Sequence, residues 1–354
     1  MTMQRVKKSY RLLLTAVLSV VFLTACGAGE EKLLTQPIED TQFLMETYVS
    51  LRIYNEGKEK VLDEGFALVQ ELADKITGET TESEISKINQ AAGEEAVAVS
   101  ADVFELLQLA AEYSGAMDGQ FNYALGPITN LWRIGFDDAR KPDQTEIDAA
   151  LEKVDYKKVQ FNEEEQTVFL EEAGMSLDLG AIAKGYMTDR VQELFAEEGV
   201  TSAIIDLGGN VFVMGGSPTR NGEIWNVGIQ DPQGSRGESI GSTKQSDASI
   251  VTSGIYERYL EVDGELYHHL MNPKTGYPFD NQIIGISIIS EKSADGDALS
   301  TLVFGLGLED GLAYVNERED VEAVFIMKDQ AVYISDGLED NFELTDDSYH
   351  LIKE

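Results

Sequence analysis

An aspartate and a threonine in the carboxyl-terminal part of the chain have the spacing of a metal site. Asp297 and Thr301 are four residues apart, so they share one face of the first turn of a helix predicted over residues 297–306. A carboxylate and a hydroxyl oxygen are hard ligands of the kind that Mg²⁺ prefers, with phosphates and water completing its coordination. A plainer interpretation also fits, in which Asp295 or Asp297 caps the helix and Thr301 faces a neighbouring helix.

Two glycine-rich segments could present backbone N–H groups to an anion. In the segment DLGAIAKG at 178–185, a strand predicted over 175–179 runs into a glycine turn and then into a helix beside Lys184. Free N–H groups and the helix dipole would favour an anion there, although the glycines could serve packing alone and Lys184 could be solvated. Gly208 and Gly209 would either let a backbone approach a ligand closely or form a tight hairpin turn.

The histidines are few enough to be informative. The chain has three, of which His350 lies in the tail, whereas His268 and His269 are adjacent in a predicted strand. Adjacent strand residues point to opposite faces, so only one of the pair can face a site. A histidine that is simply satisfied within the strand is the alternative. The turn-rich residues that follow, 270–276, are typical of a loop that lines a site.

Missing motifs and the charge exclude several functions. The sequence has no Cys/His cluster, no Gly-x-Ser-x-Gly elbow and no Walker loop, which excludes zinc chemistry, serine hydrolysis and P-loop nucleotide hydrolysis. The formal net charge is −37, so nucleic acid and anionic lipid surfaces would both be repelled. We therefore expect no nucleic-acid partner.

Hydrophobic periodicity predicts the elements that must position these residues. Alternating apolar residues over 43–53 indicate one half-buried strand, and helical spacing over 59–77 indicates an amphipathic helix. Helices are also predicted after Ser100, from Asp143 with Glu146 to about 154, and over 181–198 with Gly199 at the end. The remaining strands and hairpins are predicted at 158–170, 203–214, 256–271, 283–290 and 323–335. Together they predict an α+β fold with antiparallel sheets and packed helices.

The first 25 residues have the features of an export signal. Four basic residues precede an apolar run over 12–23 that is too short for a stable membrane-spanning helix. Small residues then lead to Cys26, the only cysteine of the chain, in a pattern that resembles the bacterial lipobox. An ordinary secretory signal followed by an incidental cysteine is the alternative.

The lipobox implies a lipid-anchored protein on the extracytoplasmic side of the cell membrane. We expect cleavage before Cys26, lipidation of its thiol, a tether over residues 26–36 and a single domain over 37–354. Cleavage would remove four positive charges and no acid, so the formal charge would become −37 − 4 = −41.

Taken together, the motifs closely resemble the ApbE family of FAD:protein FMN transferases. The resemblance runs in order from about residue 43 to residue 307. Its blocks include MET at 45–47, SEISKIN at 83–89, GQFNYALGP at 119–127, DLGAIAKGY at 178–186, DLGGN at 206–210, WNVGIQDP at 225–232, TSGIYERY at 252–259, HLMNPKTGYP at 269–278 and DALST at 297–301. The family implies an ApbE-like fold related to the T-fold.

The resemblance also implies roles for particular residues. FAD would lie against Met45, the Phe121 region with Asn122, Asp178, Lys184, Met271 and the glycine loop of Gly208 and Gly209. Mg²⁺ would be held by the carbonyl of Ala181 and by Asp297 and Thr301, near Ser300. His269 matches the histidine that assists the attacking hydroxyl. Asn122 stands where the family usually has aspartate, so no acid or base role is expected of it.

The implied reaction is a Mg²⁺-dependent transfer of FMN from FAD to a serine or threonine hydroxyl of an extracytoplasmic acceptor protein, with release of AMP. Two alternatives stay open at this level. The chain could use water as the acceptor and release FMN and AMP, or it could bind flavin without turnover. The presence of both Asp297 and Thr301 favours turnover over simple binding.

Overall fold

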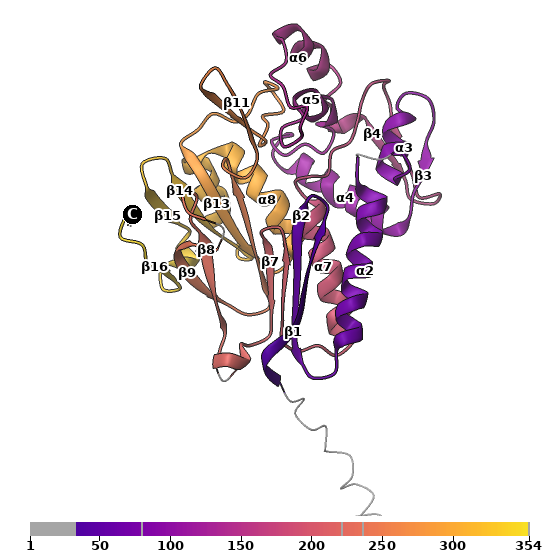
Figure 1. The fold of residues 1–354 in the computed structure, drawn as a ribbon. Coiled ribbons are helices and arrows are strands. Elements are labelled where there is room, and N and C mark those ends of the chain that lie inside the picture. The colour runs from indigo at the N-terminus through magenta and orange to yellow at the C-terminus, as the bar shows by residue number, and fades with distance from the viewer. Residues whose placement is uncertain (1–32, 79–80, 221, 236, 353–354) are drawn as a thin grey trace, which may run out of the picture.

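A nine-stranded sheet forms the middle layer of the protein (Figure 1). The computed structural model describes residues 33–78, 81–220, 222–235 and 237–352. Neighbouring strands are antiparallel, except that the last two run parallel. In spatial order the strands are β1 (Leu33–Leu44), β2 (Thr47–Asn55), β6 (Ala203–Leu207), β7 (Asn210–Met214), β10 (Ala248–Gly254), β13 (Ile283–Ser290), β14 (Val321–Met327), β15 (Ala331–Ile334) and β17 (His350–Leu351).

Both faces of the central strands are covered, which explains their continuous apolar sequences. In β14, Ala323 and Phe325 join the larger core cluster on the helical face. Val324 and Ile326, which alternate with them, join a second cluster on the opposite face. The sheet is therefore the middle of three layers.

Helices form the first outer layer. Their buried faces come from apolar residues at helical spacing, such as Leu62, Phe66 and Val69 of α2. The helices of this layer and its flank are α2 (Glu59–Ile76), α3 (Glu84–Gln90), α4 (Ala101–Ala116), α7 (Ala183–Glu197), α8 (Ser293–Leu306) and α9 (Leu308–Asn316). A small sheet of β3 (Val97–Ala98), β5 (Thr167–Leu170) and β4 (Val159–Asn162) adjoins them.

A three-stranded antiparallel sheet covers the other face. It consists of β16 (Phe342–Leu344), β9 (Ser239–Gln245) and β8 (Trp225–Gln230). Trp225, Ile240 and Phe342 from this sheet pack in the same cluster as Ile250 and Ile289 of the central sheet. Within the described ranges, the structure has no helix with the length and apolar character needed to cross a bilayer.

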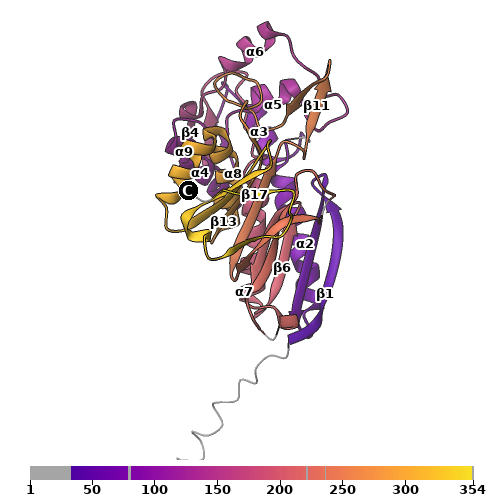
Figure 2. The same ribbon diagram turned by 90° about the vertical axis from the view of Figure 1, so that its left-hand side faces the viewer.

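A cap sits over one end of the large sheet, and the tip of the β1–β2 hairpin points toward it in both views (Figures 1 and 2). The cap contains α5 (Gly126–Trp132), α6 (Gln144–Leu151) and the hairpin of β11 (Tyr259–Val262) and β12 (Glu265–His268). Its core is a separate cluster that includes Ile128, Trp132 and Tyr267. The Trp132 indole N–H also donates to the Gly276 carbonyl at 2.8 Å, which fixes the loop after β12.

Most of the elements predicted from periodicity are present. The α+β architecture with antiparallel sheets is confirmed. The capping box of Asp143 and Glu146 starts α6 as predicted, although the helix ends at Leu151 rather than near 154. Asp263 and Gly264 form the predicted hairpin turn, with φ values of 55° and 82°.

The predicted single strand over 43–53 is wrong. The segment folds into a hairpin whose turn residues, Met45 and Glu46, have φ values of 51° and 57°. Phe43 consequently lies at the rim and is 64% exposed, while Val49 and Leu51 enter the core. The strand before this turn begins at Leu33, so residues 33–36 are not a tether but the start of β1. Cys26 and the rest of the predicted tether lie outside the described residues.

The helix predicted from residue 297 begins four residues earlier, at Ser293. Asp297 therefore lies in the second turn, and neither it nor Asp295 is the N-cap. A carboxylate from another helix caps α8 instead. Asp189 of α7 accepts the backbone N–H groups of Ser293 at 2.7 Å and Ala294 at 2.9 Å. The start of α8 is thus set by a contact between two helices.

Candidate functional site

A cleft of about 860 Å³ opens where the cap meets the helical layer and the tip of the β1–β2 hairpin. Its lining comes from segments that are far apart in the chain, which only the fold brings together. Eleven residues selected from the sequence line it: Met45, Phe121, Asn122, Asp178, Ala181, Lys184, Gly208, His269, Met271, Asp297 and Thr301.

Two of the selected residues do not line the cleft. Gly209 lies beside it in the β6–β7 turn, where its N–H donates to the Asp206 carboxylate at 3.1 Å. Ser300 is fully buried, and its hydroxyl contacts the Asp297 carbonyl and the Ser253 hydroxyl, each at 2.7 Å. Ser253 itself lines the cleft, so Ser300 supports a lining residue from behind.

The Asp297 carboxylate is held from two sides, and its side chain is only 4% exposed. Oδ2 accepts the backbone N–H of Gly185 at 2.9 Å, and Oδ1 lies 3.5 Å from the Lys184 ammonium group. The alternative of a merely solvated Lys184 is therefore wrong, because its partner is a buried acid. These contacts keep the carboxylate in one orientation toward the cleft.

Gly185 allows α7 and α8 to approach closely enough for this contact. A Cβ at this position would lie 2.3 Å from the Ser293 carbonyl oxygen and 2.6 Å from the Ala294 Cα. Both are backbone atoms of α8, so no side-chain rotation could relieve the clash. The alternative that a glycine of this segment serves helix packing therefore holds for Gly185.

We expect Gly185→Ala to lower the free energy of unfolding by ~1–3 kcal/mol, since the added methyl group would force the two helices apart. Denaturant unfolding of the purified domain measures this. Gly115→Ala is the matched control, because Gly115 lies within α4 and its Cβ would meet nothing within 4 Å. That variant should be as stable as the parent or slightly more stable. Equal stability of both variants would contradict the packing role of Gly185.

The oxygen atoms around Asp297 fit a hard cation. In a regular helix the Gly185 N–H would donate to the carbonyl of Ala181, but it donates to Asp297 instead. Among the described residues, no N–H group donates to that carbonyl, and the Thr301 hydroxyl has no hydrogen-bond partner. A carboxylate, a carbonyl and a hydroxyl are thus available along one wall of the cleft.

No cluster of three His, Cys, Asp or Glu side chains that could hold a metal occurs in the described part of the chain. A cation at Asp297 would therefore take its remaining ligands from water or from an anionic substrate. That donor set suits Mg²⁺, which retains water and binds phosphates, better than zinc.

The strand predicted over 175–179 is absent, because these residues have no regular secondary structure. The Asn89 side chain takes the place of a neighbouring strand, accepting the Leu177 N–H at 2.7 Å and donating to its carbonyl at 3.2 Å. The Asp178 carboxylate then accepts the Gly180 N–H at 2.8 Å. This turn directs the chain from residues 175–179 into α7 and places Asp178 at the cleft.

The two adjacent histidines face different environments, as their alternation predicts. His268, the last residue of β12, is buried, and its Nε2 lies 2.9 Å from the Phe279 carbonyl oxygen. His269 follows the strand and lines the cleft. Its Nδ1 lies 3.3 Å from the carbonyl oxygen of Arg258, which also accepts the His269 backbone N–H at 3.1 Å.

Loss of solvent around the imidazole lowers the pKa of His269 well below its usual value. The neighbouring charges of Arg258 and Lys184 act in the same direction. The ring is therefore neutral near pH 7. Because a carbonyl can only accept, Nδ1 carries the proton and Nε2 keeps its lone pair.

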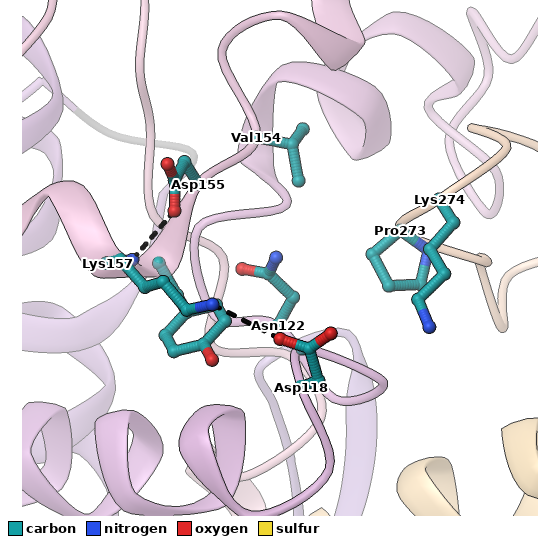
Figure 3. Close-up of a pocket in the computed structure, with 9 residues that line it drawn as sticks. Asp118, Asn122, Val154, Asp155, Lys157, Pro273 and Lys274 are labelled. Atoms are coloured by element: carbon teal, nitrogen blue, oxygen red, sulfur yellow. Dashed lines mark hydrogen bonds and ion pairs between the residues drawn. The ribbon is translucent and has the colours of Figure 1, made fainter.

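Asn122 lines the cleft and also a second, smaller hollow of about 160 Å³, which is drawn in Figure 3. Its Oδ1 accepts the Ala124 N–H at 2.9 Å, which orients the side chain. The small hollow is bordered by Asp118 and Lys157, which form an ion pair of 3.2 Å, and by Lys274 on the facing loop. An amide at position 122 adds no charge where these two spaces meet.

The sequence motifs contained cleft residues that were not selected individually. Thr252, Ser253 and Arg258 all line the cleft. All three belong to the block TSGIYERY at 252–259, which contributed to the family resemblance. Their position in that block was the available signal, but no spacing rule marks them as site residues.

Comparisons with known proteins identify the family of the chain. A model of the ApbE family matches residues 45–325. An FAD:protein FMN transferase of Klebsiella pneumoniae (strain 342) is 40% identical over 309 residues, which cover 87% of this chain and 95% of that protein. An FAD:protein FMN transferase of Treponema pallidum (strain Nichols) is 34% identical over 349 residues, covering 93% and 96%.

The fold is also similar to that of solved structures. The crystal structure of an ApbE protein from Thermotoga maritima superimposes with a TM-score of 0.79 at 27% sequence identity. The match covers 86% of this chain and 98% of that chain. The similarity thus extends over most of the chain and is not confined to the cleft motifs.

Proposed function

The chain belongs to the ApbE family, and we propose that it is an FAD:protein FMN transferase. In this proposal a serine or threonine hydroxyl of an acceptor protein receives FMN, and AMP is released. The observation that carries the proposal is that one cleft contains both the oxygen atoms of Asp297, Thr301 and Ala181 and the neutral imidazole of His269.

Separate groups of cleft residues would bind the metal, the phosphates and the flavin. Mg²⁺ held by Asp297, Thr301 and the Ala181 carbonyl would act as a Lewis acid on the pyrophosphate of FAD. The Lys184 ammonium group, which is 29% exposed beside Asp297, can bind a phosphate oxygen as well as its partner acid. Met45, Phe121 and Met271 provide apolar surface for the flavin.

The transfer step is a displacement at phosphorus. The acceptor oxygen forms a bond to the phosphorus of the FMN half, while the bond from that phosphorus to the bridging oxygen breaks. AMP leaves with the bridging oxygen. The hydroxyl proton passes to Nε2 of His269, whose orientation is set by the hydrogen bond from Nδ1 to the Arg258 carbonyl.

Mass spectrometry of an acceptor protein tests the proposal. The purified domain is incubated with FAD, Mg²⁺ and a candidate acceptor, and the acceptor should gain the mass of FMN at one serine or threonine. AMP should accumulate in equal amount. Release of free FMN and AMP without modification of any acceptor would support the hydrolase instead, and unchanged FAD would support a flavin-binding protein.

We further propose that the protein is exported and anchored by lipid on Cys26. The support is the sequence alone: a basic segment, a short apolar run and small residues before the only cysteine. The acidic character of the chain fits an anchor that does not depend on attraction to anionic lipids.

Cys26→Ala should prevent lipidation and release the protein from the membrane fraction, while the flavin transfer rate of the soluble domain stays unchanged. Fractionation with intact-mass analysis measures both properties. Wild-type protein without an acyl mass on Cys26 would contradict the anchor.

A further inference from the structure

One arginine on the cleft wall differs from every other arginine in the described residues. The chain has 64 acidic and 27 basic side chains, so a guanidinium group has many possible partners. Six of the seven described arginines form ion pairs with an acid, namely Arg52, Arg133, Arg140, Arg190, Arg220 and Arg318. Arg258 is the exception: it lines the cleft, is exposed, and pairs with no described acid.

The position of Arg258 is fixed at both its backbone and its side-chain stem. Its carbonyl accepts hydrogen bonds from the backbone and ring of His269. Its stem crosses Gly135, where a Cβ would lie 3.0 Å from the Arg258 Cδ. Gly135 has a φ of 100°, so a side chain there would be strained as well as crowded. The stem is thus held by contacts in the loop after α5.

The charge of Arg258 acts at the point where the acceptor hydroxyl must lose its proton. Both Arg258 and Lys184 lower the pKa of His269 through their positive charge, so both lie near the imidazole. Lys184 is paired with Asp297, whereas the guanidinium group of Arg258 has donors to spare. A cation held at this point of the cleft can stabilise negative charge that develops during a reaction.

We propose that Arg258 binds a nonbridging oxygen of the phosphoryl group in transfer and contributes more in the transition state than in the ground state. This inference rests on the proposed FMN transfer. The arginine would neutralise the equatorial oxygens from the side of His269, and Lys184 with the residues around Asp297 would do so from the pyrophosphate side. No bond to Arg258 forms or breaks, and its proton stays in place.

The test compares Arg258→Ala and Arg258→Lys with wild type by single-turnover FMN transfer, together with FAD binding followed by flavin fluorescence. Arg258→Ala should lower the transfer rate at saturating acceptor by ~10²–10³-fold, while the Kd for FAD changes less than about threefold. Arg258→Lys should recover part of the rate, because it restores the charge without the planar fork. Arg220→Ala is the control of equal charge, since Arg220 lies outside the cleft.

Three results with Arg258→Ala would overturn the inference. The first is an unchanged rate in Arg258→Ala. The second is a higher KM for the acceptor with an unchanged rate at saturating acceptor, which would mean that Arg258 binds a group on the acceptor. The third is a loss of FAD affinity while the transfer rate at saturation stays unchanged. If Arg258→Ala fails to fold, a wild-type rate in Arg258→Lys also overturns the inference, because the planar guanidinium group would then be dispensable. A wild-type enzyme that modifies no acceptor would refute the proposed function instead.

Discussion

Asp297→Ala is expected to lower FMN transfer by ~10³-fold or more, because it removes the only charged oxygen ligand among the candidate metal donors. The loss also leaves the Lys184 ammonium group without its buried partner and frees the Gly185 N–H. Single-turnover transfer over a range of Mg²⁺ concentrations measures the effect. The apparent affinity for Mg²⁺ should fall together with the rate.

Asp295→Ala is the matched control for this prediction. Asp295 lies on the same helix and carries the same charge, but it does not line the cleft. Its removal should leave the Mg²⁺ dependence unchanged. Normal turnover by Asp297→Ala would refute the metal assignment, and so would full wild-type activity in excess chelator. Circular dichroism of both variants separates lost chemistry from lost folding.

His269→Ala is expected to cut the transfer rate by ~10²–10⁴-fold, the range typical for loss of a general base. The Kd for FAD should change little, because the imidazole is not needed to hold the pyrophosphate. The lowered pKa of His269 means that the neutral, proton-accepting ring is already present at neutral pH and is lost only when the pH falls well below the usual histidine range. In the free enzyme, kcat/KM should therefore not fall near pH 6.5 on account of this residue.

His268→Ala is the companion variant for this test. Strand alternation predicts little effect on the rate, and the burial of His268 predicts a loss of stability. Its ring contacts Phe304 and the Phe279 carbonyl, so the variant should unfold at lower denaturant concentration while each folded molecule keeps its transfer rate. A rate loss confined to His268→Ala would show that His268, and not His269, is the base. Joint loss of FAD binding and transfer in His269→Ala would make that residue a ligand rather than a base.

Local periodicity was sufficient for much of the fold. The helix over 59–77, the hairpin around Asp263 and the capping box at Asp143 follow from interactions between residues that are close in sequence. The facing of His268 and His269 has the same origin, since alternation along a strand is a local property. The family was identifiable because its motifs occur in a fixed order along the chain.

The turn at Met45 and Glu46 was not predictable in this way. Tight hairpins with positive φ at both turn residues usually contain asparagine, aspartate or glycine there. Methionine and glutamate carry no such signal, so the apolar alternation before and after the turn indicates one continuous strand. Pairing of β1 with β2, and of β2 with β6, decides the conformation instead.

By itself, the sequence determined which residues could do chemistry here, and the tertiary structure decided how they are arranged. The residue types at Asp297, Thr301, Lys184 and His269 are enough to suggest a metal, an anion and a proton acceptor. The start of α8, however, depends on the carboxylate of Asp189, which is 104 residues away. Contacts between distant segments also bury Ser300 against Ser253 and leave Arg258 without an acidic partner among the described residues. Such contacts form only when helices, sheet and cap pack together, and local spacing carries no information about them.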